Sequence, residues 1–160
     1  VIDFFLDFKA LNFILVRRIV FLPTLLSSFY FDFFQSSGFT NFTDLPLMNY
    51  FTHNSFDYKT PQMIGGYYFN RPDMNANANF IADAYSKFGI LSVLLYSLIL
   101  RVICLIMDCF SYEKSSFILF AIFIIPIFSI TNSSLTASLL THGLFLSILL
   151  SSILIEENYL

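Results

Sequence analysis

Residues 89–107 read GILSVLLYSLILRVICLIM, an apolar stretch that only Arg101 interrupts. A transmembrane helix needs about 20 mainly apolar residues, so this stretch is long enough to cross a membrane. Two further apolar stretches follow it along the chain. They are 117–131, where Pro126 is expected to kink a helix, and 135–155, which carries no Asp, Glu, Lys or Arg. The sequence therefore predicts three membrane spans in the C-terminal half.

The composition excludes several other classes of protein. Hydrophobic residues make up 57% of the 160 residues and charged residues only 12%, and the mean hydropathy is +0.74. A soluble domain has about 25% charged residues, and a disordered chain has low hydrophobicity. A membrane β-barrel alternates polar and apolar positions, which 117–130 does not. The net charge of −3 argues against a nucleic-acid partner. We expect an all-α fold, a polytopic integral membrane helical bundle.

The N-terminal half is less uniform. Residues 11–31 are mainly apolar and are interpreted as one oblique span, with an interfacial amphipathic helix as the alternative. Residues 35–87 are polar and predict one long loop. Lys114 lies in a short turn between two spans, and the positive-inside rule then places the long loop on the extracytoplasmic side. Because the chain begins with Val1, we interpret residues 1–160 as a single membrane domain and the C-terminal part of a longer protein.

Two arginines stand inside the apolar N-terminal stretch. Arg17 and Arg18 are costly near the centre of a membrane, so they require an explanation. One interpretation is an anion clamp, because guanidinium groups match phosphate and carboxylate. The other is that both side chains reach the headgroup layer and fix the depth of the helix. His53 and His142 have no cysteine or carboxylate at ligand spacing, so no metal site is expected.

The most distinctive segment is 64–89. Asn79 predicts the N-cap of a helix that begins at Phe80, and Asp83 and Lys87 are four residues apart on one face of it. One interpretation is a capped helix with an exposed ion pair. The other is a sugar-binding rim beside the membrane, formed by polar side chains with aromatic neighbours: Arg71, Asp73, Asn75, Asn77, Asn79 and Asp83.

These residues support a family resemblance. Residues 75–89, NANANFIADAYSKFG, resemble a segment of the bacterial O-antigen and capsular oligosaccharide repeat-unit polymerases. Residues 17–23, RRIVFLP, followed by YFDFF at 30–34, are similar to a second segment of that family. The two segments span most of residues 17–89, whereas the later helices match only in hydrophobicity.

The resemblance implies a multi-pass enzyme of the bacterial inner membrane. Such a glycosyltransferase joins polyprenyl-diphosphate-linked oligosaccharide repeat units into a surface polysaccharide on the extracytoplasmic face, without a nucleotide sugar or other cofactor. A chain-length regulator and a flippase are the protein partners expected of it. A chain that is only the C-terminal part of such an enzyme would hold only part of the active site.

The implied reaction suggests roles for residues by their type and position. Positive charge at the departing diphosphate would come from Arg17 and Arg18, and next from Arg71. The first candidate for the general base that deprotonates the acceptor hydroxyl is Asp83, and the next candidates are His53 and Asp73. Glycan contacts would come from amide and phenol side chains: Asn75, Asn77, Asn79, Tyr67 and Tyr68.

Two alternatives stay open. The related O-antigen ligase also has a large extracytoplasmic loop. A non-enzymatic polysaccharide flippase or another transporter would also be a polytopic helical protein, and paired broken helices with midplane charges are typical of transporters. Pro126 is the one sign of a broken helix in the sequence.

Overall fold

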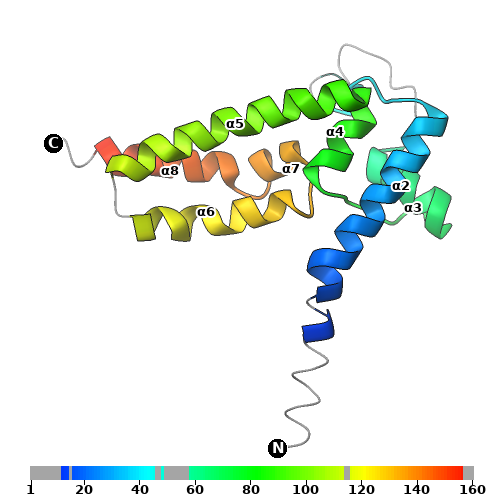
Figure 1. The fold of residues 1–160 in the computed structure, drawn as a ribbon, viewed down its shortest axis with the longest axis horizontal. Helices are drawn as coiled ribbons and strands as arrows, with labels where there is room; N and C mark the ends of the chain where they lie inside the picture. The colour runs from blue at the N-terminus through cyan, green and yellow to red at the C-terminus, as the bar shows by residue number, and fades with distance from the viewer. Residues whose placement is uncertain (1–11, 15, 46–47, 49–57, 114–115, 157–160) are drawn as a thin grey trace, which may run out of the picture.

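The computed structural model describes residues 12–14, 16–45, 48, 58–113 and 116–156, with the side chains of 111–119 and 154–156 left out. The described residues are mainly helical and contain no strand, which confirms the all-α fold (Figure 1). The elements are the π-helix η1 (Arg17–Phe21), α2 (Leu22–Ser37), α3 (Thr60–Phe69), α4 (Phe80–Phe88), α5 (Ile90–Glu113), α6 (Ser116–Ile130), α7 (Leu135–Leu140) and α8 (Leu144–Glu156).

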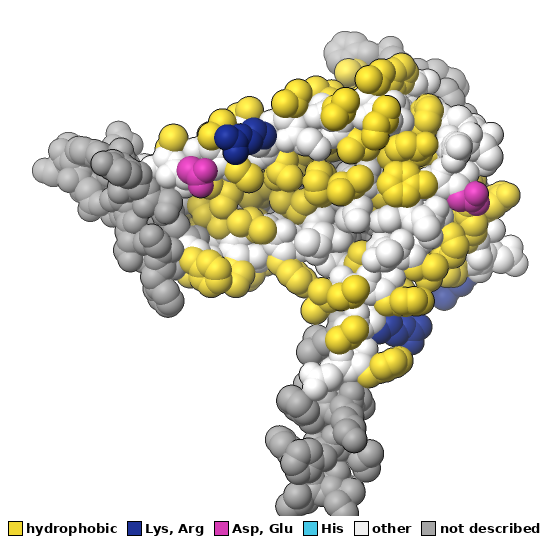
Figure 2. Space-filling model, viewed as in Figure 1, with side chains coloured by type: hydrophobic (Ala, Val, Ile, Leu, Met, Phe, Trp, Pro, Cys, Tyr) yellow, Lys and Arg dark blue, Asp and Glu magenta, His cyan; other side chains and the backbone are white. Residues whose placement is uncertain are grey.

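Helices α5, α6 and α8 pack side by side and form the apolar bundle (Figure 1). Their contact surface buries Tyr96, Ile103, Phe123, Ile130 and Leu144. The opposite surface is also apolar: Figure 2 shows hydrophobic side chains spread over the face that α5 and its neighbours present. The exposed apolar residues of α5 are Ile90, Leu91, Leu94, Leu95, Leu98, Ile99, Val102, Leu105 and Ile106.

Two helices of the described residues are long and apolar enough to cross a membrane, namely Asn12–Ser37 and Ile90–Phe110. Phe120–Ile130 and Leu144–Ile153 are apolar but shorter. The stretch 135–155, predicted as one span, is two helices, because the chain turns through Thr141, His142 and Gly143. Gly143 has φ +85°, a backbone conformation that a helix cannot contain and that glycine adopts freely.

The stretch 35–87, predicted as a loop with one helix starting at Phe80, contains α3 as well as most of α4. These two helices form the polar region together with α2. Helix α2 packs against both α3 and α4. Tyr30 and Phe34 of α2 and Ile64 of α3 are buried with alanines of the 75–82 segment. In that segment Ala76 and Ala78 are buried while Asn75 and Asn77 are exposed, the alternation expected of extended chain. The hydroxyl of Tyr30 donates to the carbonyl of Ala76 at 3.1 Å.

Local sequence features explain how this region closes. The predicted cap is confirmed: α4 begins at Phe80, and the Asn79 side chain accepts a hydrogen bond from the amide of Ala82 at 3.0 Å. Gly65 of α3 lies against the following chain, where an added Cβ would stand 2.4 Å from the carbonyl oxygen of Met74. A side chain at this position would push α3 away from the 71–78 segment.

Candidate functional site

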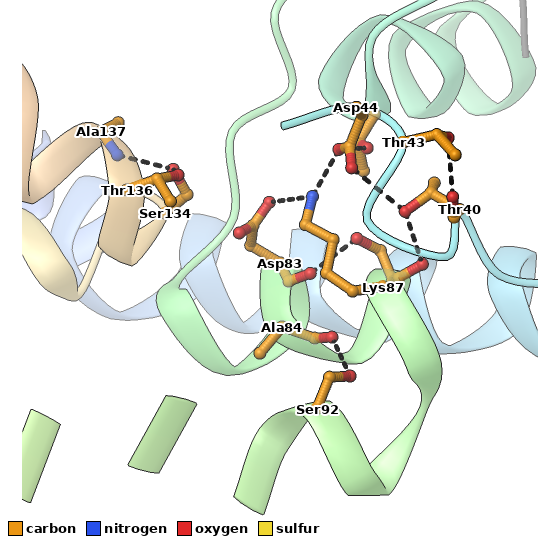
Figure 3. A network of polar contacts seen from close by, with 12 residues as sticks. Thr40, Thr43, Asp44, Asp83, Ala84, Lys87, Ser92, Ser134, Thr136 and Ala137 are labelled. Carbon is orange, nitrogen blue, oxygen red and sulfur yellow. Dashed lines mark hydrogen bonds and ion pairs between the residues drawn. The ribbon is translucent and has the colours of Figure 1, made fainter. Parts of the chain in front are cut away.

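A buried ion cluster lies where α4 meets the turn that follows α2. Lys87 Nζ contacts Asp44 Oδ2, and it lies 3.1 Å from Asp83 Oδ1 (Figure 3). The side chains of Lys87, Asp44 and Asp83 are 2%, 8% and 11% exposed. The Asp83–Lys87 pair is therefore buried, and the interpretation of an exposed helix pair is wrong. The third member, Asp44, lies in a part of the chain that no sequence pattern links to α4.

Backbone contacts hold Asp44 in place. The amide of Thr40 donates to the carbonyl of Ser86 at 2.9 Å, and the amide of Asn41 donates to the carbonyl of Lys87 at 2.8 Å. These bonds fix the turn against the last residues of α4. The Asp44 carboxylate accepts hydrogen bonds from the hydroxyls of Thr60, at 2.6 Å, and Thr40, at 3.2 Å.

The two carboxylates of the cluster have different environments. Burial raises the pKa of Asp44, but the Lys87 ammonium and the two threonine hydroxyls outweigh this effect, so the pKa lies below its ordinary value. Burial also raises the pKa of Asp83, and there the opposing effect of Lys87 is too small to cancel it. Asp83 Oδ2 is buried and has no hydrogen-bond partner among the residues that the structure describes. Such an atom calls for an explanation, because unpaired buried polar groups are rare.

Asp83 also lines a cavity of about 360 Å³, called here the Asp83 cavity. Tyr30, Asn77 and Lys87 line it on one side, and Ser134, Thr136 and His142 line it on another. Figure 3 shows the Asp83 carboxylate between Lys87 and the segment that carries Ser134 and Thr136. These polar residues of the C-terminal half thus line the same cavity as Asp83.

A second cavity, of about 540 Å³, contains the two arginines of the N-terminal stretch and is called here the arginine cavity. Arg17 and Arg18 line it together with Asn75, Asn77 and Asn132. Among the described residues, neither arginine forms an ion pair, so their charges are available to an anion. Asn77 lines both this cavity and the Asp83 cavity, which makes the two neighbours.

A third cavity, of about 620 Å³, is mainly apolar and is called here the apolar cavity. Ile103 and Met107 of α5 and Ile127 of α6 line it. Ile19 and Pro23 line both this cavity and the arginine cavity. The three cavities are therefore neighbours in a series, because each shares at least one lining residue with the next. The first is apolar, the second is lined by two arginines without an ion pair among the described residues, and the third is lined by Asp83.

The remaining predicted site residues lie elsewhere. Arg71 and Asp73 form an exposed ion pair at 3.5 Å and line none of the three cavities. Asn79 caps α4 with its side chain, and it also lines the apolar cavity. His53 lies outside the described residues.

The two predicted tyrosines lie on α3, away from the cavities. Tyr67 is exposed, whereas the ring of Tyr68 stacks on Phe29 of α2. Tyr68 donates a hydrogen bond to Asp32, and the pKa of its phenol is raised to about 12 by burial and by this carboxylate. The contacts of Tyr68 hold α3 against α2.

Sequence reasoning missed two parts of the site. Asp44 is one, and the other is the hydroxyl-bearing segment around Ser134, Thr136 and His142. The only signal for the second part was a cluster of Asn, Ser and Thr between two apolar stretches at 131–134. In the part of the chain that the structure describes, no group of three or more His, Cys, Asp or Glu residues could hold a metal ion.

The chain was compared with family models, with curated proteins and with solved structures, and none of the three comparisons finds a match. A functional proposal for this chain therefore depends on its own residues and on the three cavities.

Proposed function

We propose that this chain is part of a multi-pass bacterial inner-membrane glycosyltransferase that polymerises polyprenyl-diphosphate-linked oligosaccharide repeat units. The observation that carries the proposal is the order of the three cavities. A polyprenyl diphosphate sugar has an apolar tail, a doubly charged linker and a hydroxyl-rich glycan, in that order. The apolar cavity, the arginine cavity and the Asp83 cavity offer matching surroundings in the same order.

The surface of the apolar bundle supports a membrane location. Only 17% of the most apolar window of Ile90–Phe110 is buried inside the protein, whereas a soluble core helix would be mostly buried. An exposed apolar face of this extent is stable in lipid and prone to aggregation in water. This exposed apolar surface supports α5, with α6 and α8 beside it, as the element proposed to cross the bilayer.

The direction of α2 favours the interfacial alternative for the N-terminal stretch. Figure 1 shows α2 running steeply across the end of the apolar bundle, and not along it. If α5 crosses the bilayer, α2 lies close to the membrane surface, and so do Arg17 and Arg18 of η1, which precedes it. At that level the arginines would meet the phosphates of a lipid carrier while its tail stays among apolar side chains.

The chemistry follows from these positions. The acceptor hydroxyl oxygen attacks the anomeric carbon of the donor glycan and forms the new C–O bond. The bond from that carbon to the diphosphate oxygen breaks, and the polyprenyl diphosphate leaves with the electron pair. The Asp83 carboxylate takes the hydroxyl proton, while Arg17 and Arg18 stabilise the charge on the departing oxygens. The raised pKa of Asp83 makes its carboxylate a stronger base than an exposed one.

A gene deletion in the cells that encode the chain tests the proposed reaction. Loss of a polymerase leaves single repeat units on the lipid carrier and no long glycan. A ligase deletion would instead leave long glycan on the carrier, and a flippase deletion would leave single units on the cytoplasmic face. Either of these two results contradicts the proposal.

The arginine pair is tested in the same cells with Arg17→Ala/Arg18→Ala. We expect loss of long glycan, with partial recovery in the double Lys variant, because an ammonium lacks the fork of donors that a guanidinium offers. Arg101→Ala is the matched control, since Arg101 is exposed on α5 and lines none of the three cavities. Long glycan in the double Ala variant at matched protein level would exclude the clamp.

A further inference from the structure

The C-terminal wall of the Asp83 cavity carries hydroxyl and imidazole groups held in fixed positions. His142 Nε2 lies 3.2 Å from Ser133 Oγ, and Ser134 Oγ lies 3.1 Å from Thr136 Oγ1. Ser134 also accepts a hydrogen bond from the amide of Ala137 at 3.1 Å, which fixes the start of α7. The hydroxyl wall is defined here as Ser133, Ser134, Thr136 and His142.

The break between α7 and α8 determines the position of His142 relative to the rest of the hydroxyl wall. A continuous helix over 135–155 would distribute these residues around its axis and carry His142 away from Ser133. The turn at 141–143 instead brings His142 back to Ser133. The same break brings the wall to the end of the apolar bundle beside α4, where all four of its residues line the cavity with Asp83.

The two sides of the cavity offer complementary hydrogen-bonding groups. Asp83 Oδ2 is acceptor-only when ionised, is buried with its residue 7% exposed, and has no partner within the described ranges. The hydroxyls of the opposite wall both donate and accept. A ligand that donates to the carboxylate and also exchanges hydrogen bonds with hydroxyls carries several hydroxyl groups of its own. A space of about 360 Å³ is within the usual range for small-ligand sites.

We propose that the Asp83 cavity is a subsite for one hydroxyl-bearing sugar ring of the acceptor glycan. One hydroxyl donates to the Asp83 carboxylate, and the hydroxyl wall contacts the others and orients the ring. The assignment of the ring to the acceptor rests on the proposed polymerase function. The wall residues are positioning residues, because they hold the ring while Asp83 receives the proton.

The experiment measures protection of a single thiol in the full protein as its cells make it. Thr136→Cys places the thiol in the wall, in a background where every native cysteine, including the exposed Cys104 and Cys109, is replaced by Ser. The purified protein in detergent reacts with N-ethylmaleimide, with and without the repeat-unit oligosaccharide released from its carrier by mild acid. We expect labelling to slow about tenfold at an oligosaccharide concentration ten times the Kd, because only the free site reacts.

Two matched variants make the result specific. Ser36→Cys carries its thiol on the exposed end of α2, away from the cavity, and its labelling rate is expected to stay unchanged. Adding Asp83→Asn to Thr136→Cys should weaken the protection, because the ionised acceptor is lost. Protection at both positions, or protection at neither, overturns the subsite.

The outcome is distinguishable from failure of the polymerase. If deletion of the gene leaves long glycan intact while Thr136→Cys is still protected, the polymerase proposal fails and the cavity stands as a sugar-binding site. If deletion abolishes long glycan but the oligosaccharide gives no protection, the polymerase stands and the subsite is wrong.

Discussion

The apolar bundle of α5, α6 and α8 and the polar region of α2, α3 and α4 distribute polarity in opposite ways. The bundle exposes leucine and isoleucine along α5, whereas the polar region buries Asp83, Lys87 and Asp44. The apolar character of the bundle surface depends on the composition of α5 and is visible in the sequence. The ion cluster depends on three particular side chains from separate parts of the chain. Composition therefore accounts for the first region, whereas tertiary contacts account for the second.

The largest effect on stability is expected from breaking the ion cluster. Lys87→Met leaves Asp44 and Asp83 buried together without a counter-charge, and we expect the free energy of unfolding to fall by about 3–5 kcal/mol. The matched control is Arg71→Met, which breaks the exposed ion pair with Asp73 and should cost less than about 1 kcal/mol. Unfolding in mixed detergent micelles measures both. Equal losses would mean that the buried cluster contributes no more to the free energy of unfolding than the exposed ion pair does.

The bundle offers the next comparison. Leu144 is fully buried among α5, α6 and α7, whereas Leu98 of α5 is 65% exposed. We expect Leu144→Ala to lower the free energy of unfolding in detergent by about 2–5 kcal/mol, and Leu98→Ala to change it by less than about 0.5 kcal/mol. A large loss from Leu98→Ala would mean that the exposed face of α5 packs against another part of the protein.

Two adjacent glycines of α3 test how closely this helix packs within the polar region. A Cβ on Gly65 would meet the backbone oxygen of Met74, whereas the nearest atom to a Cβ on Gly66 is 3.7 Å away, in Pro72. We expect Gly65→Ala to destabilise the protein by about 1–3 kcal/mol. Gly66→Ala should stabilise it by up to about 1 kcal/mol, through helix propensity. Thermal unfolding of the two variants under one condition decides between these outcomes.

The pH dependence of stability is a smaller effect with a definite sign. Because the pKa of Asp83 is raised in the folded protein, the folded state binds a proton more tightly than the unfolded state does. Asp83 therefore makes stability fall as pH rises from the ordinary carboxyl pKa through the raised value. Lys87 and Asp44 in the cluster, Tyr30 of α2 and His142 of the opposite wall face the same cavity. Unfolding of the wild type and Asp83→Asn over a pH series measures the contribution, and we expect the variant to lack this decline.

Local features of the fold were predictable from the sequence. Asn79 before Phe80 identified the start of α4, because a cap depends on residues a few positions apart. The stretch 89–107 identified α5 by its length and apolar character. The break after α7 was missed because 135–155 contains no Asp, Glu, Lys or Arg, and because glycine such as Gly143 is frequent within membrane helices.

The site was predictable only in part. The sequence indicated Asp83 and Lys87 as a pair, since four residues separate them on one helix. It did not indicate their burial or the third partner, because Asp44 approaches through contacts of Thr40 and Asn41 that leave no local pattern. The arginine cavity joins residues 17–18 to 75–77, and only the folded chain brings these together.

The central proposal for this protein is that the Asp83 carboxylate acts as the general base in glycan polymerisation. The most direct test compares Asp83→Asn with Asp73→Asn in the cells that encode the protein, by the length distribution of the surface glycan at matched protein level. Both changes remove one carboxylate, but Asp73 is exposed and lines none of the three cavities. We expect Asp83→Asn to leave only single repeat units and Asp73→Asn to give the full length distribution. Long glycan in the Asp83→Asn cells would contradict the account.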